Sequence, residues 1–100
     1  VYKRQVRHPQ NVEALAAALH VAVEAGAHDK AVAWAQQLLS INPKHGMGNL
    51  DNARLKLAMG QYKEAYKQAR TAEGLLVDPG AKEQAKQIQQ QADAALNTPK

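Results

Sequence analysis

The chain has 100 residues, about the size of one domain, and a formal net charge of +4. It contains no cysteine, which excludes disulfides and thiolate metal sites, and no phenylalanine and few other aromatic residues, which excludes a large aromatic core. Alanine supplies much of its 45% hydrophobic content, and no apolar run approaches the roughly 20 residues of a membrane span. These limits favour thin layers of helices that pack through small side chains.

The positive charge is concentrated at the N-terminus. Lys3, Arg4 and Arg7 give the first eight residues a charge of +3, so the rest of the chain carries only +1. We expect residues 1–8 to form an extended or frayed basic arm in solvent. Because the chain does not begin with methionine, we also expect it to be processed or to be a fragment of a longer repeat protein.

Two helices are predicted in the first half of the chain. Asn11 is a suitable N-cap for a helix over residues 11–25, and Gly26 is suited to end it, because glycine adopts a positive φ without steric cost. An apolar stripe at three- and four-residue steps follows Leu15, Ala18, Leu19, Ala22 and Val23. The second helix, residues 29–41, is expected to turn Ala31, Ala35, Leu38 and Leu39 inward.

The third predicted helix, residues 46–59, has the weakest pattern. Gly46 and Gly48 each cost about 1 kcal/mol in a helix interior, so we expect its first turn to fray or begin late. A fourth helix begins near Gln61 and is weakened or ended by Gly74. Its inward side chains are predicted to be Tyr62, Ala65, Tyr66, Ala69 and Ala72.

The last predicted helix, residues 81–96, has one narrow apolar side. That side comprises Ala81, Ala85, Ile88, Ala92, Ala95 and Leu96. Charged and amide side chains cover the opposite side, at Lys82, Glu83, Lys86, Gln89, Gln90 and Asp93. A helix that is apolar on one side only is suited to close a stack of helices.

Three markers repeat at an interval of 34 residues. The pairs are Gly26 and Gly60, Ala31 and Ala65, and Pro9 and Pro43. The glycines end helices, the alanines allow two helices to cross closely, and the prolines end one helix or open the next. A repeat of this length is typical of stacked helical hairpins.

These spacings, Gly26-x4-Ala31-x11-Pro43 and Gly60-x4-Ala65, resemble the second half of tetratricopeptide repeats. The resemblance covers about residues 9–79, although Leu15 and Asn49 replace the large aromatic of that family's first helix. It implies an all-α fold, an α-solenoid of two antiparallel helix pairs and a C-terminal capping helix. The domain would span residues 9–96, with repeats at about 12–45 and 46–79, the capping helix at about 80–96, and a tail at 97–100.

The resemblance also implies a concave groove that is lined by the first helix of each repeat and binds a peptide or helix. The matching positions are Glu13, Ala16, His20, Val23, Glu24, Met47, Leu50, Asp51, Arg54 and Leu57. For Val23, Leu50 and Leu57 the interpretation as core residues is favoured, because solenoid helices are apolar over much of their circumference. His20, Met47 and Arg54 are the preferred ligand contacts.

No arrangement of side chains indicates catalysis. Ser40 has no neighbouring base, and the histidines at 8, 20, 28 and 45 lack the spacing of a metal site, so we expect no enzyme activity, metal or cofactor. The leading hypothesis is a scaffold module with a protein or peptide partner. The alternatives are a structural spacer or self-associating segment, including a homodimer, and an RNA-binding helical repeat. The near-neutral body disfavours nucleic acid.

Overall fold

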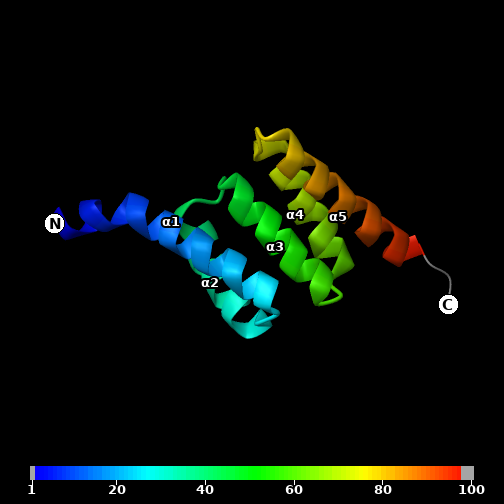
Figure 1. Cartoon of the computed structure of the whole chain (residues 1–100), viewed down its shortest axis with the longest axis horizontal. Helices are drawn as coiled ribbons and strands as arrows, with labels where there is room; N and C mark the ends of the chain where they lie inside the picture. The colour runs from blue at the N-terminus through cyan, green and yellow to red at the C-terminus, as the bar shows by residue number, and fades with distance from the viewer. Residues whose placement is uncertain (1, 98–100) are drawn as a thin grey trace.

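The computed structural model describes residues 2–97, with side chains from Val12 onward, and this part consists of five α-helices and no strand (Figure 1). The helices are α1 (Tyr2–Ala25), α2 (His28–Ile41), α3 (Gly46–Ala58), α4 (Tyr62–Leu75) and α5 (Pro79–Asn97). The predicted all-α class and five helices are confirmed. Most of the predicted C-terminal tail lies outside the described residues. Within them, no helix combines the length and apolar character that crossing a membrane requires.

The helix α3 lies at the centre of the molecule. Figure 1 shows the hairpin of α1 and α2 on one side of α3 and the pair α4 and α5 on the other. The molecule is elongated along this direction, with extents of 55 × 28 × 19 Å. Since α3 contacts all four other helices, it joins the two halves.

The repeated glycines end α1 and α3 with the same backbone geometry. Gly26 has a φ of 73° and Gly60 a φ of 79°. The N–H groups of Ala27 and Gln61 each donate to a carbonyl five residues earlier, both at 2.9 Å. The glycine N–H groups donate to the carbonyls three residues earlier, at 3.2 and 3.1 Å. Both turns are Schellman caps, which confirms the predicted role of the two glycines.

Two clusters of buried apolar side chains form the core. The cluster of the first hairpin contains Leu19, Ala22, Ala31, Ala35, Leu38 and Leu55. The cluster of α3, α4 and α5 contains Leu50, Ala53, Ala65, Ala69, Ala72, Leu76, Ala81, Ala85, Ile88 and Ala92. Ala31 and Ala65 are both 0% exposed, so the small side chains lie where the prediction requires them.

The first turn of α3 does not fray, contrary to prediction. A Cβ atom at Gly48 would lie 2.6 Å from the Leu38 Cδ2 atom, so this glycine lets α3 approach α2 closely. The His45 Nδ1 atom accepts a hydrogen bond from the Gly48 N–H at 2.8 Å and caps the helix. The Asn49 amide donates to the carbonyls of Pro43 and His45 at 3.0 and 2.9 Å. Close packing and these bonds outweigh the conformational cost of the two glycines.

The N-terminal prediction was wrong in three respects. Residues 2–8 are helical rather than extended, Asn11 lies inside α1 rather than capping it, and Pro9 does not interrupt the helix. A proline removes one backbone donor, whereas lysine, arginine and glutamine in residues 3–7 are good helix formers. A helix that already exists over residues 10–25 therefore extends toward the N-terminus at little further cost.

The C-terminal half agrees with prediction more closely. Gly74 lies in the last turn of α4, which ends at Leu75. Pro79 occupies the first position of α5, and the Asp78 carboxylate accepts a hydrogen bond from the Ala81 N–H at 2.9 Å. From the predicted apolar side of α5, Ala81, Ala85, Ile88 and Ala92 are buried in the core with α3 and α4. Ala95 is only half-buried, and Leu96 is 45% exposed.

Candidate binding groove

A cluster of ionisable side chains joins α1 to α3. Four of the ten candidate groove residues form it, namely His20 and Glu24 from α1 and Asp51 and Arg54 from α3. Spacings of three and four residues place each pair on one side of its own helix. The positive and negative groups therefore meet across the contact between the two helices.

Asp51 is the buried member of this cluster, with a side chain that is 4% exposed. Its carboxylate accepts a hydrogen bond from Arg54 Nη1 at 3.1 Å, and the His20 Nδ1 atom lies 3.3 and 3.4 Å from its two oxygens. A buried carboxylate is stable only when it is paired and hydrogen-bonded, and Arg54 and His20 supply these partners for Asp51. Asp51 is therefore enclosed by protein and not available to a ligand.

Glu24 lies at the exposed edge of the same cluster. Arg54 Nη2 donates a hydrogen bond to its carboxylate, and the His20 Nε2 atom lies 3.9 Å from the Glu24 Oε2 atom. The hydrogen bond and the charge of Arg54 lower the pKa of the Glu24 carboxyl below its ordinary value. Arg54 thus pairs with two acids of its own chain while it also lines the groove described below.

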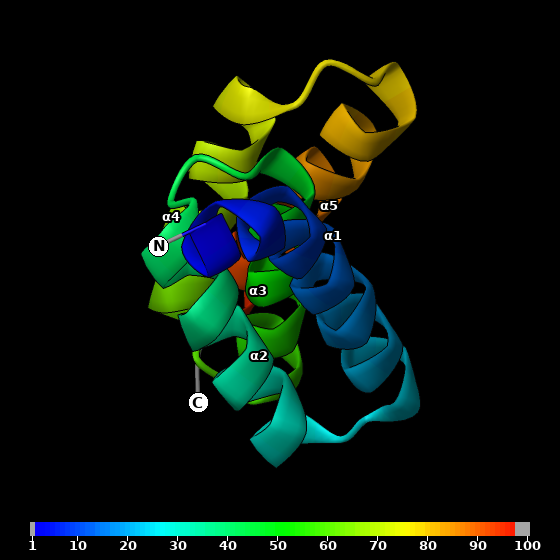
Figure 2. The same cartoon turned by 90° about the vertical axis from the view of Figure 1, so that its left-hand side faces the viewer.

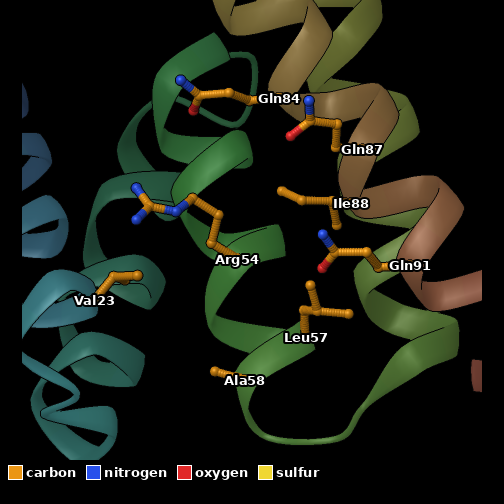
Figure 3. A pocket seen from close by; sticks show the side chains of 8 residues that line it. All are labelled: Val23, Arg54, Leu57, Ala58, Gln84, Gln87, Ile88 and Gln91. Atoms are coloured by element: carbon orange, nitrogen blue, oxygen red, sulfur yellow. The ribbon is translucent and has the colours of Figure 1, made fainter.

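A groove of about 360 Å³ lies beside this cluster, between α1, α3 and α5. Its lining is Val23, Arg54, Leu57 and Ala58 on one side and Gln84, Gln87, Ile88 and Gln91 on the other (Figure 3). Figure 3 shows the three glutamine side chains reaching from α5 toward α3. The volume falls within the range of pockets that hold small ligands or single side chains. Apolar groups and uncharged amides dominate its surface.

The structure divides the ten candidate residues into three groups. Val23, Arg54 and Leu57 line the groove, and His20, Glu24 and Asp51 belong to the ionic cluster beside it. The remaining four, Glu13, Ala16, Met47 and Leu50, do not line it. Leu50 is 0% exposed and belongs to the core of α3, α4 and α5, so it is no ligand contact. Met47 is 41% exposed at the N-terminal end of α3.

The wall formed by α5 was missed from the sequence. Gln84, Gln87 and Gln91 follow one another at steps of three and four residues, next to the apolar seam at Ile88. That spacing indicates an amide stripe on α5 that lines the groove, whereas Glu83, Lys86 and Gln90 on the same helix do not line it. The stripe can be identified as one wall of a groove only once α5 is known to lie beside α3.

Within the described part of the chain, no group of three or more histidines and acidic residues is placed to hold a metal ion. Comparison of the chain with protein-family models, curated proteins and solved structures gives no significant match.

Proposed function

We propose that this chain is a non-enzymatic protein-interaction module that binds a peptide or helix in the groove between α1, α3 and α5. In this proposal the five helices are two tetratricopeptide-like hairpins and a capping helix of an α-solenoid. The repeated Schellman caps and the buried Ala31 and Ala65 support the repeat interpretation. The alternative role as a structural spacer does not account for the groove.

One observation carries the proposal. Val23, Arg54 and Leu57, which come from the first helix of each predicted repeat, line a single groove together with α5. Val23 lies more than 30 positions before Arg54 and Leu57 in the sequence, so their convergence depends on the stacking of α1 on α3. A surface built from equivalent helices is what a peptide-binding repeat module requires.

The lining indicates the chemistry of the ligand. Val23, Leu57 and Ile88 offer apolar contact for an aliphatic or aromatic side chain. The glutamine amides both donate and accept hydrogen bonds, as the peptide backbone does. An acidic group would have to compete with Glu24 and Asp51 for Arg54. We therefore propose an uncharged segment with apolar anchors rather than an acidic tail.

Selection from a display library of random 12-residue peptides tests the proposal. Selected peptides would be titrated calorimetrically against the parent chain and two variants of α5, Gln87→Ala in the groove and Gln90→Ala on the exposed side. Gln87→Ala should weaken binding about tenfold, the equivalent of one lost hydrogen bond, whereas Gln90→Ala should leave it unchanged. Equal affinities for both variants would place the binding surface elsewhere.

A further inference from the structure

A second cavity lies between α2 and α3, on the side of α3 that faces away from the groove. Its volume is about 220 Å³, and its lining is Val32, Ala35, Gln36 and Leu39 from α2 and Asn52 and Lys56 from α3. Asn52 precedes the groove residue Arg54 by two positions, which places their side chains about 200° apart around α3. In Figure 2, α2 lies nearer the viewer than α3 at this end of the molecule. The cavity is therefore separate from the groove between α1, α3 and α5.

The cavity opens one helical turn beyond a close approach of α2 to α3. At that approach, a Cβ atom at Gly48 would lie 2.6 Å from the Leu38 Cδ2 atom. Asn52 follows Gly48 by one turn, and two crossing helices diverge on moving away from such a contact. The space between α2 and the side chains of Asn52 and Lys56 is therefore not filled by the two helices themselves.

The amide of Asn52 is buried without a hydrogen-bond partner. Among the buried polar residues of α3, Asn49 donates to two carbonyls, and Asp51 accepts a hydrogen bond from Arg54. Asn52 is 7% exposed, yet no group in the described part of the chain forms a hydrogen bond with its side chain. Burial of an unpaired amide costs stability, so folding does not account for this residue. Its position in the lining of the cavity indicates a ligand as the partner.

The 34-residue repeat supplies an internal comparison for both polar residues of the cavity. A shift of 34 residues aligns Asn52 and Lys56 of α3 with Ala18 and Ala22 of α1. The equivalent helix thus carries methyl groups where α3 carries an amide and an ammonium group. The helical repeat itself therefore requires no polar side chain at either position.

The charge of the cavity indicates the sign of the ligand. Lys56 follows Asn52 by one turn, so the two side chains lie on the same side of α3. Lys56 is half-buried, the structure describes no ion pair for it, and no acidic residue lines the cavity. The facing wall from α2 is apolar at Val32, Ala35 and Leu39. One cation and one amide beside an aliphatic wall fit an anion that carries an apolar chain.

We propose that this cavity binds a carboxylate carried on a short aliphatic chain. The Lys56 ammonium pairs with the carboxylate, the Asn52 amide donates a hydrogen bond to one carboxylate oxygen, and the wall from α2 contacts the chain. The volume of about 220 Å³ corresponds to about seven water molecules at about 30 Å³ each. A ligand of that size has about seven non-hydrogen atoms, as 3-methylbutanoate does. Its source is a free small acid or a glutamate side chain of a partner protein.

Chemical-shift titration of the isotope-labelled full chain at constant ionic strength tests the proposal. The probes are 3-methylbutanoate and a glutamate blocked as N-acetyl and N-methylamide, and the tighter one identifies the source. Binding should shift the side-chain amide of Asn52 and the backbone amide of Val32 saturably, with a Kd on the order of millimolar. The uncharged 3-methylbutanamide should bind about tenfold more weakly, because it cannot pair with Lys56.

Variants of the two polar residues separate binding from folding. Lys56→Met and Asn52→Leu should each weaken binding about tenfold, whereas Lys63→Met on the exposed surface of α4 should bind like the parent. Asn52→Leu should melt at or above the temperature of the parent, because the amide has no partner to lose and leucine is the better helix former. Peptide binding in the groove should be the same in both variants, since neither residue lines it.

Three results would each overturn the proposal. The first is the absence of saturable shifts at Asn52 with both probes, which would leave the cavity to water. The second is an affinity that neither Lys56→Met nor Asn52→Leu changes. The third is a melting temperature of Asn52→Leu clearly below that of the parent, which would assign the amide a role in folding.

Discussion

The two sides of α3 pack against their neighbours through different kinds of side chain. Toward α4 and α5 it presents Leu50 and Ala53, both 0% exposed, in a continuous apolar core. Toward α1 and α2 it presents Gly48, a single core leucine at 55, and the buried Asp51 with its ionic partners. The first contact gains stability from buried area alone. The second combines a close approach with polar groups that must find specific partners.

This difference suggests how the molecule is assembled. An apolar contact tolerates small shifts, whereas the Asp51 carboxylate is satisfied only when α1 lies at one position along α3. That position also brings Val23 beside Leu57 and Arg54 in the groove. We therefore expect the polar contact to contribute less stability than the apolar one and more to the geometry of the groove.

The largest expected effects come from truncating one leucine on each side of α3. Leu50→Ala and Leu55→Ala should each cost about 2–5 kcal/mol of the free energy of unfolding, because both side chains are buried. Amide hydrogen exchange distinguishes the two variants. Leu55→Ala should speed exchange mainly in α1 and α2, and Leu50→Ala should speed it in α4 and α5. Identical exchange patterns would contradict the division into two contacts.

The two repeated alanines provide the next test. Ala31→Leu and Ala65→Leu should each destabilise the fold by about 1–3 kcal/mol, since three extra carbon atoms enter a crossing where each alanine is 0% exposed. Thermal melting measures the effect, with Ala33→Leu at an exposed position of α2 as the control. Parent-like melting of both core variants would place the helix crossings elsewhere.

Arg54→Ala should cost about 1–2 kcal/mol, because Asp51 would remain buried with only His20 beside it. The sequence predicts Arg54 as a ligand contact, and its ion pairs add an expected contribution to stability. The exposed Arg70 of α4 is the control, and Arg70→Ala should change the free energy of unfolding by less than about 0.5 kcal/mol. Equal denaturation midpoints for the two variants would show that the ionic cluster does not stabilise the α1–α3 contact.

The smallest expected effect is a pH dependence at Glu24. The pKa of its carboxyl is lowered in the folded chain, so folding favours the ionised form. The stabilisation is present above the ordinary pKa of 4.5 and is lost as the pH falls through the lowered value. The difference in melting temperature between the parent and Glu24→Gln should therefore be positive near neutral pH and vanish in acid. A difference that persists in acid would need another origin.

Local signals in the sequence predict much of the fold. Gly26 and Gly60 are identified because a positive φ requires a particular residue type, and Ala31 and Ala65 because a close crossing requires a small side chain. Such constraints act within one turn or one crossing. The residue type at each position is therefore enough to predict the turn or the helix crossing.

The other features depend on neighbours that are distant in the sequence. Gly48 and Asp51 look unfavourable in a helix or in a core, and the approach of Leu38 and His20 from other helices explains them. The glutamines of α5 likewise become part of a groove only because α5 packs beside α3. The start of α1 is a different case. There local helix propensity decides that the helix continues through Pro9, although proline usually ends or begins a helix.

Nuclear magnetic resonance of the isotope-labelled chain, titrated with a display-selected peptide, tests the central claim most directly. If the groove is the binding surface, the largest amide shifts should cluster at Val23, Leu57 and Ile88 and in the side-chain amides of Gln84, Gln87 and Gln91. Resonances of Ala17 and Val21, which are exposed on α1 and do not line the groove, should change little. Shifts confined to residues outside the groove, or spread evenly over all five helices, would contradict a peptide-binding groove between α1, α3 and α5.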